Sequence, residues 1–123
     1  MAWKKASEEL NTLHADMVAP YPCDKRQMFG FQMFFVNDNM FTGVYEEGIM
    51  MRLSEADRIA VMRENDEAVP FSPMGRTMKE YVYLPESLLN PPEFAEKWIA
   101  KSHAYVSSLP PKLKKAKKAS KAG

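Results

Sequence analysis

The sequence lacks the features of several common protein classes. It has one cysteine, Cys23, in 123 residues, so no disulfide can form within the chain, as is typical of proteins of the reducing cytosol. No run approaches the ~18 apolar residues of a membrane-spanning helix. Residues 1–5 lack the apolar stretch of a signal peptide. These absences predict a cytoplasmic protein without membrane association.

Catalytic and metal-binding signatures are also missing. The sequence contains no G-x-S-x-G, H-E-x-x-H or C-x-x-C motif, the spacings that build a nucleophile elbow, a zinc protease or a redox dithiol. Gly75-Arg76-Thr77 resembles the end of a phosphate-binding loop, but Pro70 replaces that loop's first glycine. His14, His103 and Cys23 do not have metal-site spacing, and Cys23 has no neighbouring base. We therefore predict no enzymatic activity, no metal and no cofactor.

Charge is distributed unevenly along the chain. Hydrophobic residues make up 46% and charged residues 27%, as in an ordinary globular domain. Six of the 17 basic residues follow Pro111, so the other 11 accompany all 16 acidic residues and residues 1–111 carry a net charge of −5. Lysine, alanine, serine and glycine bury little surface. We therefore predict one folded domain over residues 1–111 and a disordered lysine-rich tail over residues 112–123.

Hydrophobic periodicity in the first half predicts a helix followed by strands. Apolar residues at steps of three and four between Trp3 and Met17 predict the helix, and the prolines at 20 and 22 end it before a connecting loop over residues 21–25. Short apolar runs separated by turn residues then predict an antiparallel meander. Its three strands are expected at residues 31–36, 40–45 and 49–53.

The second half repeats this alternation of helix and strand. Ser54 is expected to cap a helix that ends near Asn65, with an inner face of Ala56, Ile59, Ala60 and Met62. Two further strands follow near residues 68–71 and 77–84, and Asn90 is expected to cap the last helix. The order α-βββ-α-ββ-α predicts an α+β, two-layer fold with an antiparallel sheet of about five strands.

The two faces of the predicted sheet differ in polarity. Strand alternation assigns one face to the core, with Phe31, Met33, Phe35, Ile49, Met51, Val82 and Leu84. The other face mixes Phe34, Val36, Met50, Tyr81 and Tyr83 with Gln32, Arg52 and Lys79. This second face is too apolar to be simply solvated. We predict that it binds a protein partner or a second copy of the chain through Phe34, Met50, Tyr81 and Tyr83. The ten methionines fit an adaptable surface, although core packing is the alternative.

Basic residues suggest a second kind of partner, nucleic acid. The tail lysines could neutralise up to six phosphates, and they are Lys112, Lys114, Lys115, Lys117, Lys118 and Lys121. Lys25, Arg26 and Arg76 would then position the nucleic acid on the domain. The alternatives are a solubilising tail and scattered, solvated surface charges.

An ordered set of short motifs resembles the TfoX/Sxy N-terminal domain family. The matching segments are the basic-then-Met-Phe-Gly opening at residues 25–30, the hairpin at 36–41, the strand at 49–53, the segments 75–78 and 81–85, and Trp98 in the last helix. Together they span roughly residues 10–107. Phe31 stands where family members usually have a second glycine. This departure argues against a small-ligand role for that turn.

The resemblance implies a fold similar to that of secretion chaperones. Longer family members are regulators of natural competence that act with a cyclic-AMP-dependent transcription activator. They carry a second, helical C-terminal domain where this chain has its lysine tail, and the family has no recognised catalytic residues. We therefore predict a single-domain, non-enzymatic regulatory or adaptor domain that acts through protein–protein contacts in competence-type transcriptional regulation. A nucleic-acid-binding accessory protein is the alternative.

Overall fold

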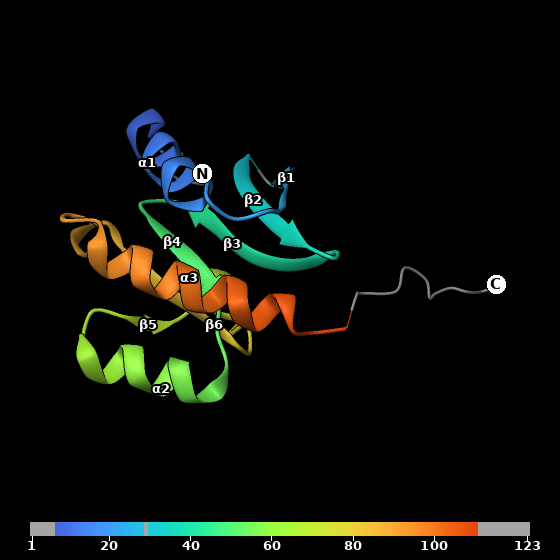
Figure 1. Cartoon of the computed structure of the whole chain (residues 1–123). Coiled ribbons are helices and arrows are strands. Elements are labelled where there is room, and N and C mark those ends of the chain that lie inside the picture. Colours follow the sequence, from blue (N-terminus) through green and yellow to red (C-terminus); the bar gives the residue numbers. More distant parts are fainter. Residues whose placement is uncertain (1–6, 29, 111–123) are drawn as a thin grey trace.

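The computed structural model describes residues 7–28 and 30–110 and has three helices and a six-stranded antiparallel sheet (Figure 1). The elements are α1 (Glu8–Val18), β1 (Asp24–Met28), β2 (Phe31–Val36), β3 (Asn39–Tyr45), β4 (Gly48–Arg52), α2 (Glu55–Glu64), β5 (Val69–Pro70), η1 (Pro73–Gly75), β6 (Tyr81–Pro85), η2 (Glu86–Leu88) and α3 (Glu93–Ser107). The strand order in the sheet is β1-β2-β3-β4-β6-β5. The predicted α+β class and antiparallel sheet are confirmed.

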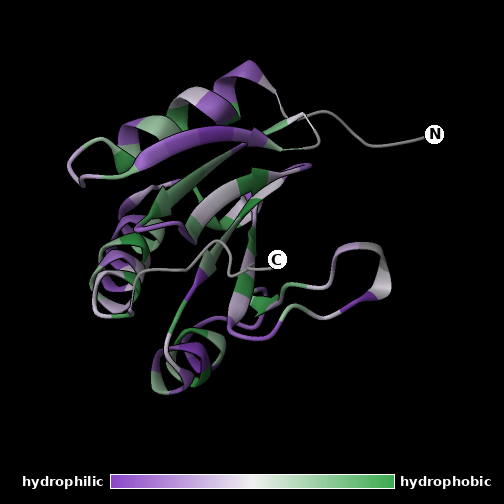
Figure 2. Cartoon of the chain, turned by 90° about the vertical axis from the view of Figure 1, so that its right-hand side faces the viewer, coloured by the Kyte–Doolittle hydropathy of each residue, from purple (hydrophilic) through white to green (hydrophobic). Residues whose placement is uncertain are grey.

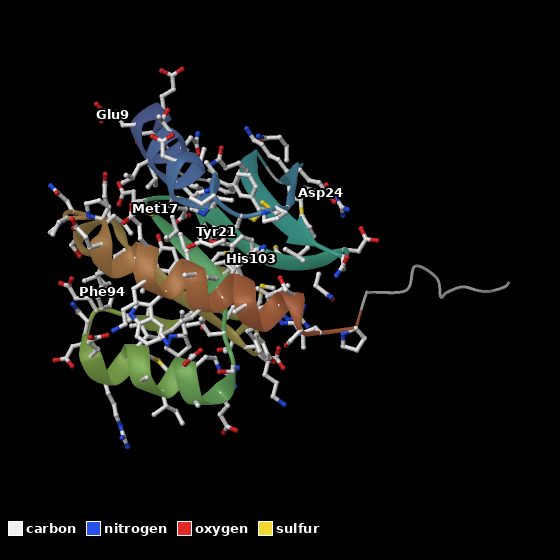
Figure 3. All side chains as sticks on the ribbon, viewed as in Figure 1. Glu9, Met17, Tyr21, Asp24, Phe94 and His103 are labelled. Carbon is white, nitrogen blue, oxygen red and sulfur yellow. The ribbon has the colours of Figure 1, made fainter. Side chains whose placement is uncertain are left out.

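The helices lie on one side of the sheet. Helix α3 crosses β3 and β4, with α1 near the β1–β2 end and α2 near the β5–β6 end (Figure 1). The connection after α1 contacts α3 through His103. The ring of Tyr21 lies 5.0 Å from that of His103 (Figure 3), and His103 Nε2 lies 3.0 Å from the carbonyl oxygen of Pro22. Residues 71–80 stand out on the other side of the sheet, away from α3 (Figure 2).

Strand pairing fixes which side chains share a face. Phe34, Thr42, Met51 and Val82 are consecutive partners across β2, β3, β4 and β6. Because Thr42 Oγ1 lies 3.1 Å from the imidazole of His14 in α1, this row faces the helices. We call this side the helix face. The neighbouring row lies on the opposite side of the sheet, which we call the open face, and it consists of Arg26, Met33, Gly43, Met50 and Tyr83.

The predicted division of side chains between the two faces is wrong for β2. Met33 lies on the open face with Met50, whereas Phe34 lies on the helix face, 7% exposed, with its ring 5.4 Å from His14. A one-residue shift of a strand moves every side chain to the other face. Strand β2 is apolar at every position except Gln32, so its own alternation does not reveal the phase.

Strand β1 was not predicted, and its first two residues, 24 and 25, were assigned to the connecting loop. It pairs with β2 along its whole length, but four of its five residues are exposed. A polar edge strand of this kind has no apolar alternation for sequence patterning to detect. The later strands are shorter than predicted, β5 covering only residues 69–70 and β6 residues 81–85.

The predicted inner face of α2 is also wrong. The buried residue of this helix is Val61, whereas Ile59 is 46% exposed. Ala56 and Ala60 are exposed as well, and Met62 is half-buried. The side of α2 that faces the protein includes the half-buried polar residues Asp57 and Arg58, which lie at helical spacing from Val61. The positions of the apolar residues alone therefore predict the wrong buried side of the helix. The Ser54 cap is confirmed, since its side chain accepts a hydrogen bond from Asp57 N at 3.2 Å.

Helix α3 begins later than expected. Its first residue is Glu93, and Pro92 rather than Asn90 occupies the cap position without a side-chain hydrogen bond. The helix is held to the sheet from its middle instead. Ser102 Oγ donates a 2.6 Å hydrogen bond to the carbonyl of Arg52 at the end of β4, and Ile99 is fully buried. Packing against the sheet therefore places α3 more strongly than its start signal does.

Candidate functional site: a methionine-lined cleft

The open face contains an apolar cleft of about 480 Å³. Its floor comes from the sheet and one wall from the segment between β5 and β6. The lining residues are Met28, Met33, Met40, Tyr45, Met50, Phe71, Pro73, Arg76, Thr77 and Met78. Five of the ten methionines of the chain therefore meet in one place. The volume lies in the range of clefts that hold whole small molecules.

Gly43 shapes the floor of the cleft. A Cβ at this position would overlap Met33 Sδ and lie 3.1 Å from the backbone oxygen of Gln32. The absence of a side chain therefore leaves the space that the Met33 thioether occupies. Met50, the partner of Gly43 in the neighbouring strand β4, is fully buried at the base of the cleft.

Stacked aromatic rings stiffen one end of the cleft. Phe71 lies edge-on to Tyr45 with ring centroids 5.2 Å apart, and it stacks on Tyr83 at 6.0 Å. Tyr83 Oη donates a 2.9 Å hydrogen bond to the carbonyl of Tyr45. Burial, together with the nearby Glu46 carboxylate, raises the pKa of Tyr83 to about 12. The phenol therefore stays protonated and keeps this donor at neutral pH.

The wall segment is closed on itself by short hydrogen bonds. Met78 N donates to the carbonyl of Phe71 at 2.8 Å, and Phe71 N donates to the carbonyl of Tyr81 at 3.0 Å. The hydroxyl oxygens of Ser72 and Thr77 lie 3.0 Å apart. These contacts join the two ends of the segment, so the wall is preorganised in the free protein.

Only some of the four residues predicted to bind a partner line the open face. Met50 and Tyr83 share it, but Met50 is fully buried at the base of the cleft. Tyr81 is half-buried, and its Oη donates a 3.2 Å hydrogen bond to the carbonyl of Met40. Burial raises the pKa of Tyr81 as well. Phe34 belongs to the helix face, so it cannot contribute to a surface on the open side.

The basic residues predicted to position nucleic acid are not brought together as a group. Lys25 and Arg26 are neighbours on β1, so their side chains point to opposite faces. Arg26 binds Asp38 at 2.5 Å and lies 4.3 Å above the ring of Phe35. Arg76 is in the wall of the cleft. The tail lysines Lys112, Lys114, Lys115, Lys117, Lys118 and Lys121 lie outside the described residues.

The cleft itself was not predicted from the sequence. Met28, Met40, Met78 and Phe71 come from four different elements or connections. The available signal was the concentration of methionines between residues 28 and 51. That signal did not show that residues 71–78 fold back over the same part of the sheet.

The candidate nucleophile and metal ligands occupy structural positions. Burial lowers the pKa of His14 to about 3, and the imidazole is held by Thr42 at 3.1 Å and Gln32 at 3.2 Å. Burial and the charge of Asp24 raise the pKa of the Cys23 thiol, which disfavours the reactive thiolate. Within residues 7–28 and 30–110, no three acidic, histidine or cysteine side chains are placed to hold a metal ion.

Fold and cleft together define an α+β domain with an apolar cleft on the side of the sheet that the helices leave open. The profile of the TfoX N-terminal domain matches residues 18–105, and the chain belongs to this family. The family is linked to competence regulation and is not a known enzyme family. No curated protein and no solved structure matches the chain. None of the helices in the described part is long and apolar enough to cross a membrane.

Proposed function

We propose that this protein is a non-enzymatic regulatory domain that binds a partner protein through its open face, in competence-type transcriptional regulation. The observation that carries the proposal is the methionine-lined cleft. Apolar surface concentrated in a hollow is where protein interfaces place their strongest contacts. A large apolar side chain of the partner would enter the cleft and contact Met33, Met50 and Met78.

The chemistry of the lining favours binding over catalysis. Arg76 is the charged member of the lining set, and Thr77 and Tyr45 are its hydroxyl-bearing members. General acid–base catalysis needs a group whose pKa lies near the working pH. Burial raises the pKa of Tyr45 above its usual value near 10, which moves that phenol further from neutral pH. Methionine side chains instead provide a flexible, polarisable surface that adapts to apolar groups of different shape.

The substitution Met78→Gln tests the proposal. Met78 is half-buried in the wall of the cleft, and glutamine keeps a similar length while adding a polar amide. Met62→Gln is the matched control, since Met62 is also half-buried but lies on α2, away from the lining residues. We expect Met78→Gln to weaken partner binding about tenfold or more, because an amide loses its hydration in the cleft. Met62→Gln is expected to leave binding unchanged.

The partner must also displace a small apolar probe from the cleft. Proteins captured by the wild type and by Met62→Gln, but not by Met78→Gln, are purified and titrated against the fluorescent probe N-phenyl-naphthylamine bound to the domain. Displacement of the probe supports the proposal. Capture that is equal for all three proteins contradicts it. A homodimer that Met78→Gln dissociates would identify a second copy of this chain as the partner.

A further inference from the structure

Arg76 gives the apolar cleft one charged corner. It lies in the wall segment directly after η1, and its backbone N–H donates to the carbonyl of Pro73 at 3.1 Å. The side chain is exposed, and no carboxylate among residues 7–28 and 30–110 lies within ion-pair distance of it. A guanidinium held at the rim of an apolar site is suited to bind a carboxylate of an incoming group.

Three other cations of the domain already form ion pairs with carboxylates of the chain. Arg26 binds Asp38, Arg52 Nε donates to Glu80 Oε1 at 2.7 Å, and Lys97 lies 3.3 Å from Glu64. Their charges are therefore partly satisfied in the free protein. Within the described part of the chain, no carboxylate neutralises Arg76 in this way, so this cation of the cleft lining has capacity for an external anion.

The cleft also has an end that disfavours an anion. A shallower depression adjoins it and shares Tyr45, Phe71 and Pro73 with it. Glu46 lines that depression. A negatively charged ligand group would be attracted at Arg76 and repelled near Glu46, so the two residues fix the direction in which a charged segment can lie.

We propose that the partner protein presents a short segment in which an aspartate or glutamate stands next to the large apolar side chain that enters the cleft, and that Arg76 binds this carboxylate. This inference rests on the function proposed above, because it names the chemistry of the partner for the same site. The proposed occupant is an acidic–apolar segment of another protein. A free fatty or aromatic acid shares the chemistry and is distinguished by the experiment.

Two fluorescent probes with the same ring system test the charge requirement. Anilinonaphthalene sulfonate is an apolar anion, and N-phenyl-naphthylamine is its neutral counterpart. Both are titrated into the full-length protein and into two variants, Arg76→Gln and Lys79→Gln. Lys79 is the control, because it is an exposed cation three residues away that does not line the cleft. An exposed ion pair strengthens binding by about twofold to fivefold.

The expected result is that the anion binds the wild type and Lys79→Gln about twofold to fivefold tighter than it binds Arg76→Gln, while the neutral probe binds all three equally. Equal binding of the anion to all three proteins overturns the role of Arg76 but leaves the proposed function intact, provided that Met78→Gln weakens both probes. If neither probe binds, both the role of Arg76 and the proposed function fail.

Competition then identifies the source of the carboxylate. Two short peptides with the same phenylalanine and leucine residues, one flanked by glutamate and one by glutamine, are compared with decanoate as competitors of the bound anionic probe. Stronger displacement by the glutamate peptide than by the glutamine peptide and by decanoate supports a protein segment. Displacement by decanoate at lower concentration than by either peptide overturns the protein source in favour of a free acid.

Discussion

The ring of Tyr83 lies over Gly48, diagonally across the β4–β6 ladder, in which Gly48 pairs with Pro85 and Tyr83 with Met50. A Cβ at Gly48 would be 2.6 Å from the end of that ring and 2.5 Å from the backbone oxygen of Leu84. The same ring stacks on Phe71 at one end of the cleft. The absence of a side chain at Gly48 therefore permits both the close strand pairing and the aromatic end wall.

Gly48→Ala is expected to destabilise the fold by about 1–3 kcal/mol, the usual cost of inserting an extra carbon into a packed site. The contact with Leu84 involves backbone, which cannot move as a flexible side chain does. Urea unfolding measures the change. A variant that unfolds at the wild-type midpoint would show that the sheet relaxes around the added methyl group and would contradict this explanation of Gly48.

The Tyr83 phenol predicts an alkaline limit to stability. Its pKa is raised to about 12 in the folded protein, above the value near 10 of an unfolded chain. The folded state therefore holds this proton more tightly. The resulting stabilisation is fully present below about pH 10 and is lost as the pH rises toward 12. Tyr83→Phe should remove this part of the pH dependence, as measured by urea midpoints at pH 9 to 12.

Tyr83→Phe should also lower the stability at neutral pH by about 0.5–1.5 kcal/mol, the usual net value of one hydrogen bond. The loss arises because the carbonyl of Tyr45 no longer receives its 2.9 Å bond. If the variant and the wild type lose stability in parallel above about pH 10, another group causes the alkaline limit.

The lowered pKa of His14 predicts that the stability of the fold decreases in acid. Its pKa is about 3 when folded, against 6.5 when solvated, so the unfolded chain binds the proton more tightly. The stabilisation is present above about pH 6.5 and is lost as the pH falls toward 3. With one proton bound on unfolding, the slope approaches about 1.4 kcal/mol per pH unit between roughly pH 5.5 and pH 4.

The substitution His14→Asn should flatten this acid slope while lowering stability at neutral pH. The neutral imidazole accepts from Gln32 at Nδ1 and donates from Nε2 to Thr42, whose hydroxyl donates to the carbonyl of Met50 at 2.6 Å. His103→Asn is the control, because it replaces the other histidine of the chain and leaves the contacts of His14 in place. An unchanged slope in His14→Asn would assign the acid limit to the carboxylates instead.

Binding to duplex DNA should be weak at physiological salt. Residues 1–111 carry a net charge of −5, and Arg26 is engaged by Asp38. Fluorescence anisotropy of labelled duplex DNA compares the full chain with residues 1–111. Any affinity of the full chain at low salt should fall steeply as salt rises, because it rests on lysine–phosphate contacts. Tail-dependent binding that persists at physiological salt would favour the nucleic-acid alternative.

The sequence predicts the local elements of this fold better than their relative placement. Hairpin turns and the Ser54 cap act over a few residues, so the strands from Phe31 to Arg52 and the start of α2 could be predicted. The phase of β2 could not, because its residues are apolar on both faces and the bulge between Phe34 and Phe35 is a tertiary feature. For the same reason, Phe34 was wrongly assigned to the predicted partner surface.

The cleft depends on contacts between distant segments. Met33 and Met78 are 45 residues apart in the sequence and meet only because residues 71–80 fold over the open face. Short backbone hydrogen bonds from Phe71 and Met78 hold that segment, and backbone bonds leave no residue-type signal. Sequence patterning could therefore indicate an apolar sheet face but not the hollow that forms on it.

Methyl-labelled methionine NMR tests the binding role of the cleft most directly, since methionine is both its main lining residue and a reporter elsewhere in the domain. Titration of the full chain with N-phenyl-naphthylamine should shift the methyl signals of Met28, Met33, Met40, Met50 and Met78, which line the cleft. The signals of Met17, Met51 and Met62 should stay in place, because these residues lie in α1, on the helix face and in α2. Shifts confined to the second group, or no shifts at all, would contradict the assignment of the cleft as the binding site.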